Sequence, residues 1–356
     1  MVKPTTWLPQ LYQRFQPFWD RALPAAGLAL LLWASAETTG AFSPEWRLFL
    51  AVALFLLGMT SPGSAYVAFV FLVAYPLYRI SIYLAALLLA ILVLTAPWAM
   101  QNLGATVLVL ITPALLPWRL EIASPLLAGL WWGELGGVLV GALAALWLKL
   151  LAGMAGQPLD LTHLSGWTPE GANVVTRFGG FNSLQTLLEL FNPFADTSQA
   201  LLLHLLQILA WALAGYVAGL LARRVWSDRW RGWAPLLSAL PAAGVLWLSY
   251  GLISQFMNPT QDDLSAWLND LAPWLLAAAL AAATLRQFYL YLRRPLARAP
   301  IARREPATAQ AHPAPRRGRS SNAPQPEPKP SFNWSAVKRP PSATETDDDI
   351  IMLEID

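Results

Sequence analysis

Residues 198–222 read SQALLLHLLQILAWALAGYVAGLLA and contain no charged side chain. At a rise of about 1.5 Å per residue, a helix of this length crosses a hydrocarbon core about 30 Å thick. Comparable apolar runs fill most of the chain between Pro24 and Tyr291, whereas nearly everything after them is polar, proline-rich and charged. We therefore expect an all-α fold: a polytopic integral membrane helical bundle followed by a disordered C-terminal tail.

The composition agrees with this expectation and limits the chemistry. The 356 residues are 56% hydrophobic and 13% charged, against about 45–50% and about 25% in soluble domains. The arginines behind the net charge of +3 border apolar runs, so we attribute them to membrane topology and expect no nucleic acid partner. With no cysteine and only three histidines, we expect neither a metal site nor a bound cofactor.

Nine apolar runs stand out, and the longest of them, 122–152, exceeds one straight crossing. It predicts either a strongly tilted helix or a short re-entrant piece at about 122–132 followed by a full helix. The other runs are 23–36, 47–60, 64–78, 82–99, 104–117, 198–222, 232–255 and 272–291.

The arginines predict the orientation. Four of them lie in the loop from Arg223 to Arg231, whereas the loop 256–271 carries three aspartates and no basic residue. The first loop should therefore be cytoplasmic and the second should face outward. The predicted location is the plasma (inner) membrane, multi-pass, with both termini cytoplasmic. That requires an even number of crossings, so we expect about eight spans, with ten as the alternative.

The sequence divides into three parts. Residues 1–22 form a cytoplasmic N-terminal segment that could lie on the membrane as an amphipathic helix. Residues 23–292 form the transmembrane domain, with a long outward segment at 153–197 that is rich in proline and glycine. Within that segment, a short amphipathic helix is expected from Ser183, capped by Asn182. Residues 293–356 form the tail.

The tail has segregated charge, basic over 293–339 and acidic over 343–356. Anionic lipid headgroups should attract the basic part. The last residues of the tail, 349–356, combine acidic with aliphatic side chains, which is typical of a peptide that docks on a soluble cytoplasmic protein. A solvated end that folds back on the arginines is the alternative. The basic candidates are Arg293, Arg294, Arg316, Arg317 and Arg319, and the docking candidates are Ile350, Ile351, Leu353 and Ile355.

Glycine recurs every fourth residue at Gly133, Gly137 and Gly141. On a helix these positions share one face and leave a groove into which another helix can pack, within this chain or in an oligomer. Glu134 lies in the same run and could bind a cation, a proton or a cationic solute, or could sit at the interface. Lys149 lies near the end of the run, and we expect it to snorkel outward.

His204 and Gln207 are three residues apart in the run 198–222, so they share a helix face. With Glu134 they form the candidate intramembrane polar site. The two side chains could bind a small polar solute, together with Asp160, His163 or Arg177. Alternatively they could serve only as hydrogen-bonding partners between helices.

The stretch from Ser124 to Gly153 resembles the glycine-spaced helices of the substrate-binding components of energy-coupling-factor vitamin transporters. It is also similar to helices of the rod-shape membrane protein family. The resemblance covers about thirty residues and rests on proline and small residues at helical spacing. It implies close helix packing, and no residue role follows from it.

No nucleophile elbow, zinc-protease or Walker spacing occurs in the sequence, so we expect no enzymatic activity. The first hypothesis is a scaffold or accessory subunit whose cytoplasmic tail recruits a partner or anionic lipid. The alternative is a small-solute transporter or the membrane-embedded substrate-binding subunit of one.

Overall fold

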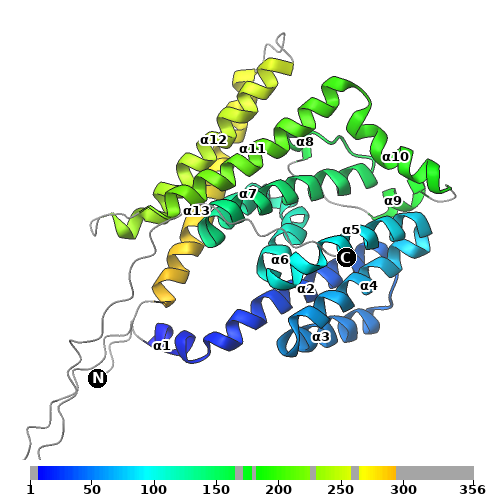
Figure 1. Cartoon of the computed structure of the whole chain (residues 1–356), viewed down its shortest axis with the longest axis horizontal. Coiled ribbons are helices and arrows are strands. Elements are labelled where there is room, and N and C mark those ends of the chain that lie inside the picture. Colours follow the sequence, from blue (N-terminus) through cyan, green and yellow to red (C-terminus); the bar gives the residue numbers. More distant parts are fainter. Residues whose placement is uncertain (1–6, 165–170, 179–181, 225–229, 258–263, 294–356) are drawn as a thin grey trace, which may run out of the picture. The chain divides into compact units, whose positions relative to one another are not determined.

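The computed structural model describes residues 7–164, 171–178, 182–224, 230–257 and 264–293, and every regular element among them is a helix (Figure 1). The helices are α1 (Trp7–Arg14), α2 (Gln16–Thr39), α3 (Pro44–Thr60), α4 (Pro62–Ile80), α5 (Ile82–Gln101), α6 (Leu103–Ile111), η1 (Thr112–Trp118), α7 (Ala123–Met154), α8 (Leu161–Leu164), α9 (Gly171–Phe178), α10 (Ser183–Ala195), α11 (Ser198–Ala222), η2 (Arg231–Trp233), α12 (Ala234–Met257) and α13 (Leu264–Leu292).

The expected helical membrane bundle is confirmed. In the described part of the chain, six helices are long and apolar enough to cross a membrane: α4, α5, α7, α11, α12 and α13. Each of the nine predicted runs falls on a helix. Helix α2 has 24 residues and α3 has 17, and both pack with the others. With these two the number of long helices is eight, and eight crossings remains a prediction.

Two groups of helices share the interior. Buried side chains of α7, α11, α12 and α13 form one apolar core, and those of α2 to α6 form a second. Many large apolar side chains point away from both cores. Leu94 is 81% exposed and Phe256 is 71% exposed. In water such a surface would be costly, whereas lipid is a suitable solvent for it.

Helix α7 is folded back on itself at Gly133. This residue has φ 75° and ψ −165°, a conformation that is essentially restricted to glycine. A Cβ on Gly137 would lie 2.9 Å from the Cα of Gly129, and one on Gly141 would lie 3.3 Å from the Cβ of Pro125. In a straight helix these pairs would be about 12 and 24 Å apart. Residues 123–132 therefore run antiparallel to residues 134–154. This confirms the second of the two predictions for the run 122–152, a short piece at about 122–132 followed by a full helix.

The glycines of α7 let this hairpin approach α11 at backbone distance. A Cβ on Gly137 would overlap the carbonyl group of Gly215, and one on Gly141 would lie 2.6 Å from the carbonyl oxygen of Trp211. Gly133 was expected to line the same groove, but its main contribution is the turn that reverses α7. The glycine spacing identified the groove, and the length of the run 122–152 indicated that the chain could fold back.

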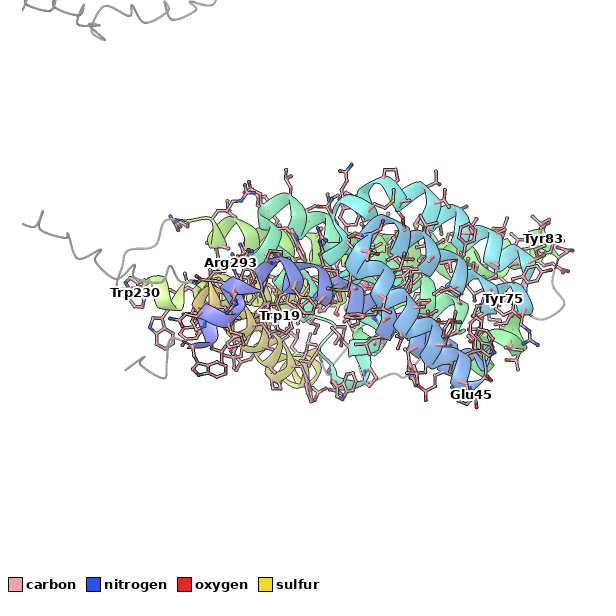
Figure 2. All side chains as sticks on the ribbon, turned by 90° about the horizontal axis from the view of Figure 1, so that it is seen from below. Trp19, Glu45, Tyr75, Tyr83, Trp230 and Arg293 are labelled. Carbon is pink, nitrogen blue, oxygen red and sulfur yellow. The ribbon has the colours of Figure 1, made fainter. Side chains whose placement is uncertain are left out.

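The N-terminal segment and the end of α13 lie at the same end of the bundle. Gln13 Nε2 donates a hydrogen bond to the carbonyl oxygen of Leu292, and the ring of Tyr12 lies 6.4 Å from that of Tyr289. Figure 2 shows Trp19 and Arg293 toward this end, with Tyr75 and Tyr83 toward the other. An even number of crossings, which the arginine pattern predicted, would place α1 and the end of α13 on the same side of a membrane, and it remains a prediction.

Candidate functional site

Lys149 is the centre of a polar cluster inside the α7–α11 contact. Its side chain has no exposed surface. The ammonium nitrogen lies 2.6 Å from the carbonyl oxygen of Leu159, 2.6 Å from Gln207 Oε1 and 3.1 Å from His204 Nδ1. An ammonium has three N–H donors, and here each of them has an acceptor. The expected snorkelling of Lys149 is therefore wrong, because buried acceptors replace water at its charged end.

The acceptors come together because the chain turns back into the bundle after α7. Gly156 has φ +70°, which favours glycine, and lies at the end of the helix. Beyond it, Leu159, Leu161 and Leu164 are 4%, 5% and 1% exposed. Their burial fixes residues 157–164 over Lys149, about 8 Å from the end of α7. We call residues 157–164 the re-entrant segment.

Gln207 connects the buried cation to a carboxylate. Its Oε1 accepts from Lys149, while its Nε2 donates to Asp160 Oδ1 on the re-entrant segment. The same carboxylate oxygen accepts from the backbone N–H of Thr162 at 2.9 Å and from its hydroxyl at 2.7 Å. The amide of Gln207 is thereby oriented by opposite charges on its two sides, and the charge of Lys149 is balanced within the protein.

His204 extends the cluster to a fourth element. Its Nε2 lies 3.3 Å from the carbonyl oxygen of Pro193 in α10. Since a carbonyl only accepts and Lys149 only donates, we assign the proton to Nε2 and the lone pair to Nδ1. The cluster therefore joins α7, the re-entrant segment, α10 and α11.

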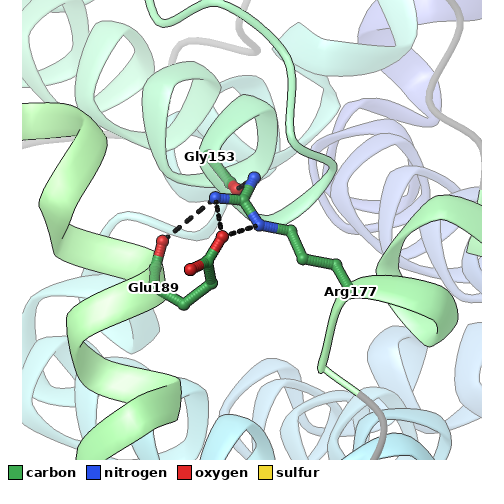
Figure 3. A network of polar contacts seen from close by, with 3 residues as sticks. All are labelled: Gly153, Arg177 and Glu189. Carbon is green, nitrogen blue, oxygen red and sulfur yellow. Dashed lines mark hydrogen bonds and ion pairs between the residues drawn. The ribbon is translucent and has the colours of Figure 1, made fainter.

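A second ionic contact holds α9 and α10 against the same end of α7 (Figure 3). Arg177 donates from Nε to Glu189 Oε1 at 2.8 Å and from Nη1 to the carbonyl oxygen of Gly153 at 2.8 Å. Its Nη2 reaches the carbonyl oxygen of Glu189 at 3.1 Å. Helix α10 is itself fixed by a capping box between Asn182 and Gln185, which confirms the predicted cap.

The structure brings together only part of the predicted polar site. His204 and Gln207 share the Lys149 cluster. Glu134 instead follows the turn at Gly133, at the far end of the arm 134–154, and pairs with Arg223 at 2.9 Å. Fifteen residues of helix separate Glu134 from Lys149, or about 22 Å. The side chain of Glu134 is 29% exposed and that of Arg223 is 59% exposed. Glu134 is thus placed as an acid near the surface.

The sequence analysis did not identify Lys149 as the centre of the polar site, and it gave Asp160 only as one of three optional partners. The signal was present, because Lys149 is the one basic residue within the long run 122–152 and an ionisable group in such a run needs a partner. Arg177 binds Glu189 instead of joining this cluster, and the side chain of His163 lies outside the described part of the chain.

Of the tail candidates, only Arg293 is described, and it lies 3.9 Å from Asp20 with its guanidinium over Tyr289. Arg294, the remaining basic candidates and the docking residues lie outside the described residues. Among the described side chains, no three His, Asp or Glu residues gather closely enough to hold a metal ion.

Comparison with protein-family models, with curated proteins and with solved structures gives no match to this chain.

Proposed function

We propose that this chain is a small-solute transporter, or the membrane-embedded solute-binding subunit of one, without catalytic chemistry of its own. The observation that supports it is a lysine with no exposed surface inside a predicted span. Two of its partners lie on α11, and the third lies on a segment that folds back into the bundle. Buried intramembrane charges are costly and usually mark solute or ion pathways. An apolar side chain of the same length would fill the space without that cost.

The cluster has the properties of a gate at the predicted outer end. While the re-entrant segment is in place, Lys149 and Asp160 are satisfied by protein groups. If the segment withdraws, water enters and solvates both charges, which offsets part of the cost of exposing the buried side chains of Leu159, Leu161 and Leu164. We propose that this offset keeps the open state within a few kcal/mol of the closed one, as an alternating pathway requires.

The proposed orientation follows from the positive charges. Arg293 follows α13, whose last carbonyl accepts a hydrogen bond from Gln13 of α1. Arg223 follows α11 and pairs with Glu134 beside the turn at Gly133. We propose that both arginines face the cytoplasm of a plasma (inner) membrane and that the re-entrant segment faces outward.

The gate is tested with cysteine labelling, for which the natural chain is suited because it contains no cysteine. Leu159→Cys places a thiol on the re-entrant segment, and a membrane-impermeant thiol reagent added to intact cells reports how often it is exposed. Lys149→Met keeps the side-chain length but removes the hydrogen bonds to Leu159 and Gln207 and the positive charge that balances Asp160. If the substitution destabilises the closed state by about 1.4 kcal/mol relative to the open state, the labelling rate should rise tenfold.

Transport itself is tested with proteoliposomes loaded with a radiolabelled amino acid, sugar, nucleobase or phosphate. We expect protein-dependent efflux of at least one probe and a changed rate in Lys149→Met. The matched control is Arg223→Gln, which removes an exposed charge at the other end of α11 and should leave the rate unchanged. Efflux of none of the four probes, or equal efflux from Lys149→Met and the natural chain, would contradict the proposal.

The scaffold hypothesis is the second candidate, and the charge-segregated tail favours it. A basic stretch beside the last span can hold anionic lipid, and the acidic, aliphatic end can order on a partner. Deleting residues 295–356 should then abolish recovery of a cytoplasmic partner while leaving the Leu159→Cys labelling rate unchanged. Unchanged partner recovery after the deletion would reject this second function.

A further inference from the structure

A cavity of about 360 Å³ lies on the side of α7 opposite the Lys149 cluster. Its lining residues come from α2, α4, α5, α6, η1, α7 and α9, and Ala155 directly after α7 also contributes. The cavity thus lies where the two groups of helices meet, since Phe69 and Leu88 belong to the α2–α6 core and Trp147 packs against it. Its volume falls in the range of small-molecule pockets, about 300–1,000 Å³.

The lining is apolar with a few neutral polar groups and no charged side chain among the described residues. The hydroxyls of Thr38 and Thr39 already donate to carbonyl oxygens of their own helix at 3.1 and 2.7 Å. By contrast, Ser35 Oγ and Trp147 Nε1 are buried and have no hydrogen-bond partner within the part of the chain that the structure describes. Unpaired polar atoms of this kind are uncommon in proteins and call for an explanation.

We infer that this cavity binds an uncharged, largely apolar small molecule that carries one hydrogen-bonding group. The apolar walls exclude an ionic ligand, because nothing in the lining balances a charge. Ser35 can turn its hydroxyl into the cavity by rotation about χ1, and the indole N–H of Trp147 is a donor only. A ligand hydroxyl or carbonyl can therefore accept from either group while the rest of the molecule fills the apolar volume.

The inference is independent of the proposed gate. Trp147 and Lys149 are two residues apart on α7, so they point about 200° apart around the helix axis. Trp147 faces the cavity and Lys149 faces α11. A chain that fails every transport test could still bind a ligand at the cavity, and the experiment below reads binding alone.

The test is photolabelling of the full-length protein in phosphatidylcholine liposomes with a diazirine derivative of 1-decanol, mapped by peptide mass spectrometry. We expect labelling that saturates, that unlabelled 1-decanol competes away, and that falls on peptides containing Ser35, Phe69 and Trp147. Ala34→Phe and Ala114→Phe each add a ring to the lining of the cavity. Each should lower saturable labelling by about tenfold or more, because the ring occupies space that the probe needs and packed protein atoms leave no other room. The matched control is Ala90→Phe, an exposed α5 position that does not line the cavity.

The polar group is tested with Trp147→Phe, which keeps an aromatic ring and removes the N–H. It should weaken binding of the alcohol by about 3- to 10-fold, the effect of one hydrogen bond, and leave binding of the corresponding diazirine alkane unchanged. Labelling that never saturates, or that Ala34→Phe and Ala114→Phe leave at the level of Ala90→Phe, would overturn the inference. Equal saturable labelling of the same peptides by a diazirine phospholipid would assign the cavity to membrane lipid and overturn the small-molecule assignment.

Discussion

The close contact between α7 and α11 predicts that glycine-to-alanine substitutions change the free energy of unfolding in opposite directions at two positions. Gly137 and Gly244 are both within long helices. A Cβ at Gly137 would overlap the backbone of Gly215, whereas nothing lies within 4 Å of a Cβ at Gly244. Gly137→Ala and Gly244→Ala therefore add the same methyl group to a closed site and to an open one.

The magnitudes follow from two terms. Alanine in a helix interior is more stable than glycine by about 0.5–1 kcal/mol. Forcing a methyl group into a packed site costs about 1–3 kcal/mol, and the atoms met at Gly137 are backbone atoms that cannot rotate away. We expect Gly244→Ala to raise the free energy of unfolding by about 0.5–1 kcal/mol. Gly137→Ala should lower it by up to about 2 kcal/mol once the two terms are combined.

The assay is unfolding of the purified protein in mild detergent by increasing sodium dodecyl sulfate, followed by tryptophan fluorescence. The 18 tryptophans provide the signal. The natural chain and both variants are measured in parallel, so that the comparison rests on differences. If Gly137→Ala is as stable as Gly244→Ala, the two helices do not meet at backbone distance and the hairpin of α7 is misplaced with them.

Four further predictions follow from single contacts. Gly133→Ala should lower the unfolding free energy by about 1–3 kcal/mol, because φ 75° and ψ −165° are strained for a Cβ-bearing residue; an unchanged detergent midpoint would contradict the turn. Arg177→Met removes three hydrogen bonds between α9, α10 and α7, so amide hydrogen exchange over residues 183–195 should accelerate at least tenfold. Exchange as slow as in the natural chain would argue against this contact. Glu134→Gln breaks an exposed ion pair and should change stability by less than about 1 kcal/mol; a larger loss would mean that the acid is buried. Cysteines at the exposed positions Gln10 and Gln185 should label from opposite sides of the membrane, Gln185 in intact cells and Gln10 only after permeabilisation, whereas labelling of both from outside would refute the orientation.

The membrane assignment and the positions of the helices were predictable from the sequence. Nine apolar runs became helices, and the cap at Asn182 was found from its local pattern. These properties are sums over neighbouring residues: hydropathy over a span, and hydrogen bonds between a cap and the first turn. The glycine spacing likewise identified a groove, because residues four apart share a helix face.

Only the tertiary structure decided what the polar residues in the helices do. Lys149 and His204 are 55 positions apart in the chain, and Asp160 reaches the same cluster because the chain turns at Gly156. From the run alone, Lys149 could equally well reach water, and Glu134 could equally well lie at mid-membrane. Whether an ionisable group meets water, another charge or lipid depends on long-range packing, so the buried lysine was determined by the arrangement of four elements rather than by its neighbours in sequence.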